Sequence, residues 1–369
     1  MATAAEAAVK AGGEIARAAR SLDQRRRLFL VVLGGILVLV LIAALSIGAV
    51  TIGAFEILAI LAKPLGLDLG VAFGPREETV LLAIRVPRIV LGLLAGAALA
   101  VSGAALQGLF RNPLADPALI GVSMGAALAA VATIVLGGAL AASLPAGARH
   151  LMLPAAAFAG GLAAVLAVYR IAARDGRTDV ATLLLAGIAV NAIAQAGIGY
   201  LMFISDDQQL RDLNFWLLGS LGGNTWDRML PVVPFVVLPL LALPLLARHL
   251  NVLALGEREA LHLGFDVERT KRLIVVLAAM ATGATVALTG VIGFVGLVVP
   301  HLVRLIVGPN HRTLLPASIL LGAVLLLLAD LCARMIVLPA ELPIGILTSC
   351  IGGPFFIWLL MRRRALGGW

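Results

Sequence analysis

Charged side chains are scarce in this sequence. Asp, Glu, Lys and Arg make up only 13% of its 369 residues, whereas hydrophobic residues make up 61%. In a soluble globular chain about one quarter of the residues are charged. The mean hydropathy of +1.07 also indicates an unusually apolar chain. The composition therefore excludes a soluble globular protein and predicts a chain that lies mostly within a membrane.

Groups that carry out chemistry are also few. The cysteines Cys332 and Cys350 both lie in apolar stretches, which indicates neither a disulfide nor a zinc site. The five histidines are scattered without ligand spacing, which favours interfacial or solvated positions over a haem or metal site. No Gly-Lys dipeptide occurs, so the phosphate-binding P-loop is excluded and the chain does not hydrolyse ATP by that route. We expect no enzyme active site and no permanently bound cofactor.

Long apolar runs fill most of the sequence. A membrane-spanning helix needs about 20 apolar residues, and the sequence contains many such stretches. We assign ten spans, although the seventh and eighth are hard to separate, so that nine spans remain an alternative. The segments are 28–50, 80–108, 117–137, 151–170, 181–203, 229–247, 273–292, 294–308, 314–338 and 343–361. The sequence therefore predicts an all-α polytopic membrane protein with about ten transmembrane helices.

The distribution of Lys and Arg predicts the orientation of the chain. In a ten-span arrangement most basic residues fall on one side, in the segments 25–27, 170–177, 248–272 and 362–364. Because cytoplasmic loops carry an excess of Lys and Arg, we expect both termini in the cytoplasm. The net charge of +8 mostly expresses this bias and does not indicate nucleic-acid binding.

The first 24 residues precede the membrane domain, which covers 25–369. The apolar run that follows them is about twice as long as the core of a signal peptide, and it lacks a convincing cleavage site. We therefore expect residues 1–24 to form a mobile cytoplasmic tail with some helical tendency.

Small residues recur at every fourth position in the second apolar segment. They are Gly92, Gly96, Ala100, Ala104 and Gly108. A spacing of four places them on one face of a helix, and such a face lets two helix backbones approach closely within a membrane. The helix then meets a polar corner with two prolines at 111–117, where it must end. The pattern predicts a tightly packed helix rather than a simple anchor.

A faint internal repeat is present. Displacing the chain by 187 positions aligns Gly96 with Gly283 and Pro113 with Pro300. Five spans separate the two copies, and an odd number gives them opposite orientations in the membrane, as in the inverted repeats of transporters. The alternative is chance similarity between helices rich in Gly and Ala.

The longest polar insertion, 248–272, falls on the cytoplasmic side. It predicts a short helix from about Glu257 to Leu263, with Gly264 as its C-cap and Asp266 as the N-cap of the next helix. Ala260, Leu261 and Leu263 give the short helix an apolar side. The insertion is interpreted either as a docking helix for a cytoplasmic partner or as a solvated loop.

A second insertion, 204–228, falls on the outer side. The spacing of Leu210, Leu213, Trp216 and Leu217 predicts an amphipathic helix at the outer membrane surface.

Asp330 and Arg334 are the clearest case of charge within the predicted spans. Their i, i+4 spacing near the outer end of the ninth span favours a local ion pair. An ion-coupled transporter is expected to carry an acidic residue near mid-membrane, and we find none that is well placed.

Seven motifs resemble those of the permease subunits of type II ATP-binding-cassette importers for iron chelates, haem and cobalamin. They are RVPR at 85–88, SGAALQGLFRNPLADPALIGVS at 102–123, LLLAGIAVNA at 183–192, LALGEREALHLGFDVERTKR at 253–272, GFVGLVVPHLVRLIVGPNHRTLLP at 293–316, LLLLADLCAR at 325–334 and ELPIGILTSCIGGPFFIWLL at 341–360. The resemblance runs from the first span to the last, and residues 1–24 and the loop 60–78 fall outside it.

This resemblance implies a division of labour between subunits. Two copies of the permease would form a channel at their interface, with pore walls mainly from the fifth span and its neighbours. Two copies of an ATPase subunit would carry ATP and Mg, and a periplasmic binding protein would deliver the cargo. The direction would be import across the inner membrane of a Gram-negative bacterium. Haem is the favoured cargo, with ferric siderophores and cobalamin as alternatives and an ion-coupled transporter or channel as a more distant one.

The resemblance also implies roles for particular residues. Coupling to the ATPase falls on Glu257, Arg258, Ala260, Leu261, Leu263 and Gly264. A cytoplasmic gate falls on Asn112, Pro113, Leu114, Thr178, Asp179 and Val180. Docking of the binding protein falls on Arg85, Arg88 and Arg334. For the gate the alternative is a structural corner whose Asn caps backbone groups, and for the arginines it is contact with lipid phosphates or pairing with Asp330.

Overall fold

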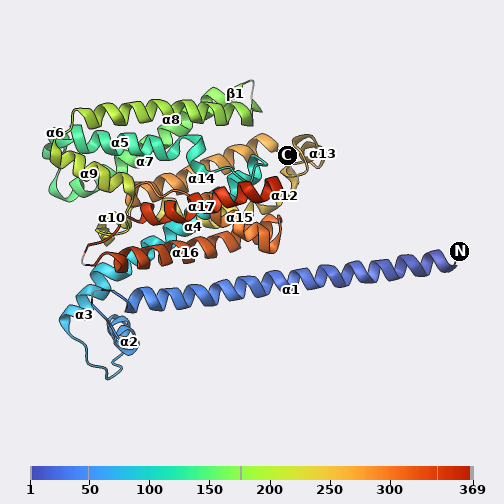
Figure 1. The fold of residues 1–369 in the computed structure, drawn as a ribbon, viewed down its shortest axis with the longest axis horizontal. Helices are drawn as coiled ribbons and strands as arrows, with labels where there is room; N and C mark the ends of the chain where they lie inside the picture. Colours follow the sequence, from blue (N-terminus) through green and yellow to red (C-terminus); the bar gives the residue numbers. More distant parts are fainter. Residues whose placement is uncertain (1, 49, 175–176, 339, 366–369) are drawn as a thin grey trace.

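Helices make up almost all of the described chain (Figure 1). The computed structural model describes residues 2–48, 50–174, 177–338 and 340–365. The longer helices are α1 (Ala2–Ser46), α4 (Val86–Leu109), α5 (Val122–Leu136), α7 (Ala146–Ala172), α8 (Val180–Phe203), α9 (Asp207–Leu218), α11 (Val233–Leu245), α14 (Val267–Thr289), α15 (Val295–Val307), α16 (His311–Ile336) and α17 (Ile344–Ala365). The shorter segments are α2 (Ala54–Ala62), η1 (Lys63–Leu65), α3 (Pro75–Thr79), η2 (Val80–Arg85), η3 (Pro117–Ile120), α6 (Gly138–Ser143), the antiparallel strands β1 (Ala173–Arg174) and β2 (Arg177–Thr178), α10 (Trp226–Met229), α12 (Ala247–Leu253) and α13 (Glu257–His262).

The helices agree with the predicted class of polytopic membrane protein. Among the described residues, six helices are long and apolar enough to cross a membrane, and a seventh is counted if α11 and α12, which meet at 56°, form one span. Three shorter apolar helices, α5, α15 and Ile344–Leu359 of α17, occupy the remaining predicted segments. The seventh and eighth predicted spans are separate helices, because Gly290 and Phe294 adopt positive φ angles of 70° and 68° between α14 and α15.

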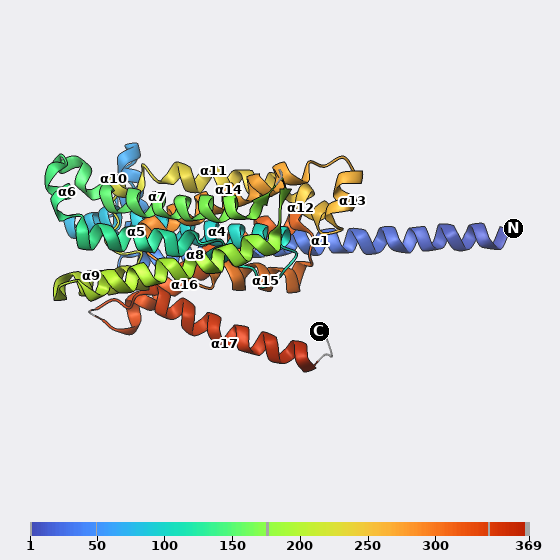
Figure 2. The same cartoon turned by 90° about the horizontal axis from the view of Figure 1, so that it is seen from above.

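Both ends of the described chain lie toward the end of the bundle that carries α13, and α1 projects well beyond that end (Figures 1 and 2). We call this the inner end, after the predicted topology, and the opposite end, which carries α2, α6 and α9, the outer end. Helix α1 is continuous over 45 residues. The segment predicted as a tail therefore extends the helix of the first span past the bundle instead of forming a separate unit.

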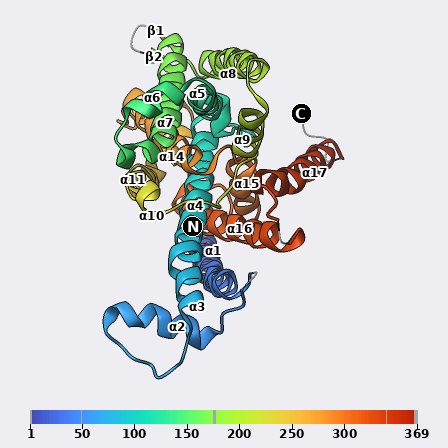
Figure 3. The same cartoon turned by 90° about the vertical axis from the view of Figure 1, so that its left-hand side faces the viewer.

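Helix α4 lies at the centre of the bundle, between α14, α15 and α16 (Figure 3). All five residues of its small-residue stripe are buried. A Cβ on Gly96 would overlap the carbonyl of Gly322 on α16, and a Cβ on Gly322 would overlap the carbonyl of Gly96. Gly92 faces Leu327, and Gly108 faces His311. The predicted close packing is confirmed: α4 and α16 run antiparallel, their backbones meet at Gly96 and Gly322, and the contact extends over about four turns from Gly92 to Gly108.

The helix predicted within 204–228 is present as α9. The Asp206 carboxylate accepts a hydrogen bond from the Gln209 backbone N–H at 2.8 Å, and the Gln209 side chain accepts one from the Asp206 N–H. This reciprocal capping box fixes the start of the helix. Leu213 is fully buried, whereas Phe215 is 64% exposed.

Helices α4 and α14 run in opposite directions. The amide of Asn224 donates to the Leu288 carbonyl near the end of α14, and the neighbouring Gly222 lies against Arg88 at the start of α4. The end of one helix therefore meets the start of the other, as an inverted repeat requires. The repeat itself stays a prediction.

We expect Gly96→Ala to lower the thermal stability of the protein. The new methyl group meets the Gly322 carbonyl, and overpacking of this kind costs about 1–3 kcal/mol. The matched control is Gly35→Ala on α1, where a Cβ would have no neighbour within 4 Å. In the control the better helix propensity of Ala leaves stability unchanged or slightly higher. Thermal unfolding in detergent, followed by tryptophan fluorescence, measures both, and equal melting temperatures would contradict the packing argument.

Candidate functional site

A cluster of buried ion pairs closes the outer end of the bundle. Arg88, in the first turn of α4, donates to Asp330 on α16 (Nε to Oδ1, 2.9 Å) and to Glu341 before α17 (Nη1 to Oε2, 2.8 Å). Arg334 pairs with the same Asp330 at 3.1 Å, which confirms the local ion pair expected from their spacing. The Asp330 side chain is 2% exposed and the Glu341 side chain 49%. One aspartate is thus shared by two guanidinium groups, away from water.

Arg85 and Arg334 also bind the end of α1. Arg85 donates to the carbonyls of Leu45, Ser46 and Val50, and Arg334 donates to the carbonyl of Ala44 at 3.4 Å. The last carbonyls of a helix have no partner within the helix and carry its negative dipole end. The two guanidinium groups therefore satisfy the C-terminus of α1 in hydrogen bonding and in charge.

These contacts occupy all three arginines that the sequence assigned to docking. Arg85 is 3% exposed, and Arg88 and Arg334 are each 7% exposed. The structure does bring them together at the outer end, as predicted, but each one binds groups of its own chain. Their role toward a binding protein stays a prediction.

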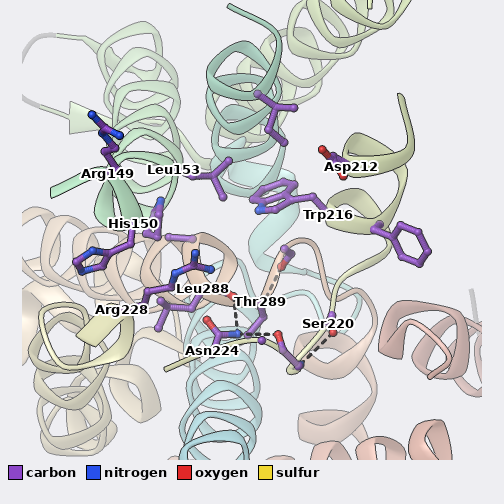
Figure 4. Close-up of a pocket in the computed structure, with 17 residues that line it drawn as sticks. Arg149, His150, Leu153, Asp212, Trp216, Ser220, Asn224, Arg228, Leu288 and Thr289 are labelled. Carbon is purple, nitrogen blue, oxygen red and sulfur yellow. Dashed lines mark hydrogen bonds between the residues drawn. The ribbon is translucent and has the colours of Figure 1, made fainter. Parts of the chain in front are cut away.

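A pocket of about 440 Å³ opens beside this cluster, between the start of α7, α9 and the end of α14 (Figure 4). Arg149, His150 and Arg228 gather on one side of it, and Asp212 lies on the other, beyond the Trp216 ring. The Asn224 amide donates to the Leu288 carbonyl at 3.1 Å and forms part of the floor. The pocket therefore presents two arginines and an aromatic ring, which suits an anionic, partly apolar ligand.

Helix α13 lies at the inner end and corresponds to the predicted coupling helix. Its C-terminus forms a Schellman motif: the Gly264 N–H donates to Leu261 O and the Phe265 N–H donates to Ala260 O. Gly264 adopts a φ of +82°, the left-handed conformation that this motif needs. The next helix begins at Asp266, whose side chain accepts from the Arg269 N–H as predicted. The predicted N-cap is confirmed, whereas the C-cap of α13 is Leu263, and Gly264 is the left-handed residue that follows it.

The apolar residues of α13 point two ways. Ala260 is fully buried, whereas Leu261 and Leu263 are 59% and 60% exposed. Arg258 is also exposed. The helix is therefore anchored by its alanine and leaves two leucines at the surface of the inner end.

Lys271 connects α13 to its surroundings. Its ammonium group, on the first turns of α14, donates to the Glu257 carboxylate at 2.8 Å, to Glu268 at 3.1 Å and to the Thr178 carbonyl at 2.9 Å. Lys271 is only 3% exposed. One buried cation thus joins the start of α13, the hairpin before α8 and the body of α14.

The residues predicted as a gate lie in two turns at the inner end. Asn112 accepts a hydrogen bond from the Leu114 N–H at 3.0 Å, so its side chain does cap a backbone group. The Thr182 hydroxyl and N–H donate to Asp179 at 2.6 and 2.7 Å, and these bonds hold the pKa of the Asp179 carboxyl below its ordinary value. Within the described residues no hydrogen bond or ion pair joins 112–114 to 178–180. Whether they face each other across a channel stays a prediction.

Sequence reasoning missed the outer pocket and the Lys271 junction. Arg149, His150 and Arg228 directly precede the fourth and sixth spans on the outer side, against the trend of basic residues, and this position was a usable signal. For Lys271 only the Glu268 neighbour three residues earlier was visible. Its bonds to Glu257 and Thr178 depend on the folded arrangement.

Comparisons with known proteins show the family of this chain. The profile of the FecCD transport family matches residues 36–362. The hemin transport system permease protein HmuU of Yersinia pestis is 48% identical over 283 residues, which cover 77% of this chain and 83% of the relative. The cobalamin import system permease protein BtuC of Halobacterium salinarum is 46% identical, covering 79% and 76%. The Fe(3+) dicitrate transport system permease protein FecD of Escherichia coli is 43% identical, covering 79% and 88%.

A solved structure has the same fold. It is an inward-facing conformation of an ABC transporter of the metal-chelate type. The two chains superpose with a TM-score of 0.78 at 32% sequence identity, covering 90% of this chain and 98% of the other.

We expect Asp330→Asn to destabilise the protein strongly. The change leaves two buried guanidinium groups without their shared negative charge, and breaking a buried pair costs about 3–5 kcal/mol. The control is Glu78→Gln, which removes the ion pair with Lys63, whose side chain is 56% exposed. Surface pairs contribute only about 0–1 kcal/mol. Melting temperatures in detergent measure the difference, and a similar small shift in both variants would show that the outer cluster is not structural.

Proposed function

This chain belongs to the FecCD transport family, and from that premise we propose that it is the transmembrane subunit of an ATP-driven importer that moves haem from the periplasm to the cytoplasm. Three relatives are named as hemin, cobalamin and Fe(3+) dicitrate permeases, and the hemin permease shares 48% identity. A related iron chelate or cobalamin is the alternative cargo. An ion-coupled transporter or channel is the more distant alternative, since the buried acidic residue Asp330 is engaged in ion pairs with Arg88 and Arg334.

The exposed leucines of α13 are the observation that carries the proposal. The helix is fixed to α14 by Lys271 and displays Leu261 and Leu263 at the inner end. A short rigid helix with two exposed apolar side chains fits the groove of a partner protein. We assign that partner as an ATPase subunit, present in two copies, which holds the ATP and Mg that this chain has no P-loop to bind.

A second copy of the chain is proposed to complete the channel. Helices α8 and α17 lie at the edge of the bundle, and α17 stands away from it (Figures 2 and 3). Both expose large apolar side chains, such as Ile193 (70%) and Phe203 (86%) on α8 and Ile357 (60%) on α17. We assign these faces to the contact with the second copy, so that the fifth span, α8, borders the channel.

The outer end is proposed to receive the periplasmic binding protein. For Arg85, Arg88 and Arg334 to take part, carboxylates of the binding protein must exchange with the contacts that the arginines make within the chain. Guanidinium groups suit this exchange because they bind carboxylates in a bidentate manner. The adjoining pocket, with Arg149 and Arg228, suits the carboxylates of an anionic cargo such as haem. The protein is accordingly placed in the bacterial inner membrane, with both termini in the cytoplasm.

We expect Leu261→Asp to abolish ATP-driven uptake without unfolding the permease. Docking of α13 would bury the new carboxylate in the partner's groove, which is unfavourable. The fold is retained because Leu261 is 59% exposed and lies outside the core. The matched control is Leu67→Asp, an equally exposed leucine (58%) near the outer end. The measurement is uptake of haem, ferric siderophores and cobalamin by proteoliposomes that contain the permease, its ATPase and its loaded binding protein. Gly264→Val, which strains the Schellman motif, is expected to behave like Leu261→Asp.

Three outcomes separate the alternatives. Uptake of a siderophore or cobalamin in place of haem changes the cargo but keeps the importer. If both uptake and binding of the ATPase persist in the Leu261→Asp variant, α13 is not the coupling element and belongs to an ordinary loop. Uptake driven by an ion gradient in the absence of the ATPase overturns the importer itself.

The turns 112–114 and 178–180 are proposed to form the cytoplasmic gate between the two copies. Both lie at the inner end, and Leu114 and Val180 are partly exposed there. Residues that close a channel must be accessible to the opposite copy, and these two satisfy that condition.

We expect Leu114→Cys and Val180→Cys to crosslink across the dimer in the inward-closed state only. The background replaces the two free cysteines, Cys332 and Cys350, with Ser. The matched control pairs Leu114→Cys with Phe203→Cys, because Phe203 ends the same helix that Val180 begins, about 35 Å away. Crosslinking is measured on denaturing gels with and without ATP analogues. Crosslinking that is equal with and without ATP analogues, or that is absent in both conditions, would refute the gate.

A further inference from the structure

A second large pocket, of about 620 Å³, lies at the inner end between α1 and α15. Ten residues line it: Arg25, Arg26, Leu28, Phe29, Val32, Arg304, Leu305, Ile306, Val307 and Gly308. The function proposed above makes no use of this pocket. Its walls are of two kinds, since three of the residues are arginines and most of the others are apolar.

The charge of the pocket has one sign. Arg25 and Arg26 come from α1 and Arg304 from the last turn of α15, and none of the ten lining residues is acidic. Guanidinium groups bind phosphate with good geometry and keep their charge at any physiological pH. The arginine side of the pocket therefore suits a phosphate group.

The apolar side suits acyl chains. Leu28 is 64% exposed, Leu305 is 56% exposed and Ile306 is 61% exposed. In the span Gln24–Ser46 only 17% of the most apolar window is buried within the chain, so α1 presents most of its surface to lipid. Basic residues at the level of the headgroups, directly beside such a surface, are the arrangement that binds anionic lipids. A free phosphate or nucleotide would use the arginines but leave the leucines uncovered.

We propose that this pocket is a binding site for an anionic phospholipid of the inner leaflet, with its phosphate on the arginines and its acyl chains along α1 and α15. The assignment of the leaflet rests on the predicted topology and not on the transported cargo. The α1 side of the pocket, from Arg25 to Val32, precedes residues 36–362, which match the family profile. The site thus includes residues that the family profile does not match.

The experiment is native mass spectrometry of the purified permease after exchange into phosphatidylglycerol, cardiolipin or phosphatidylcholine. Arg25→Gln is compared with Arg27→Gln, which removes the same charge from an exposed neighbour that does not line the pocket. We expect about five-fold less bound phosphatidylglycerol for Arg25→Gln, since one basic residue near an anionic surface contributes about 1 kcal/mol. Phosphatidylcholine binding should be weak in all variants.

A second variant tests the apolar half of the site. Val32→Trp fills the pocket without changing the charge, and Val32 is 48% exposed, so the fold tolerates the change. We expect it to reduce phosphatidylglycerol binding, while excess inorganic phosphate leaves binding unchanged. Equal binding by the Arg25 and Arg27 variants, or normal binding by Val32→Trp, overturns the site. Displacement by inorganic phosphate would assign the pocket to a soluble anion instead. None of these results depends on uptake, so they are independent of the importer assignment.

Discussion

The close approach of α4 to its neighbours is the constraint on which the rest of this structure depends. Lipid tails are as apolar as leucine, so helices in a membrane gain little from hydrophobic burial and must gain from van der Waals contact. Gly96 and Gly322 allow that contact between α4 and α16, and Gly103 allows it between α4 and α15 at Gly296. Most of α4 is consequently sealed from lipid: 83% of its most apolar window is buried. The helices that surround it take their positions from this axis.

Polar contacts at both ends fix the register of this packing. At the outer end Arg88 and Arg334 share Asp330. At the inner end the side chain of Asn251 accepts from the backbone N–H of His311, where α16 begins beside Gly108. Helix packing by small residues tolerates sliding, because a stripe of glycines repeats every turn. Charged and amide groups placed at single points remove that freedom, since a shift by one turn would leave them buried without partners.

The sequence predicted the features that depend on local pattern. Apolar run length identified the spans, the four-residue spacing identified the packing face of α4, and cap residues such as Asp266 and Gly264 placed the ends of α13 and α14. The i, i+4 spacing found the Asp330–Arg334 pair. It did not find that Arg88, 242 positions away from Asp330, completes that pair. Sequence reasoning also assigned the three outer arginines to a docking surface, because nothing in the order of residues shows that Arg85 binds carbonyls at the end of α1. Contacts between distant segments depend on how the helices pack in the folded bundle, and the spacing of residues in a single sequence predicts only local contacts.

The buried ammonium of Lys271 has a mechanical consequence. Lys271 is bonded at once to α13, to the hairpin before α8 and to its own helix, so it couples the position of α13 to that of α14. Helix α14 is about 34 Å long, so if it tilts as a rigid body by about 5° about one end, its other end moves by about 3 Å. Helix α14 ends at Thr289, which borders the outer pocket, and the carbonyl of Thr289 accepts a hydrogen bond from the Ser220 N–H. A small displacement applied on one side of the membrane is thereby delivered to a cavity on the other.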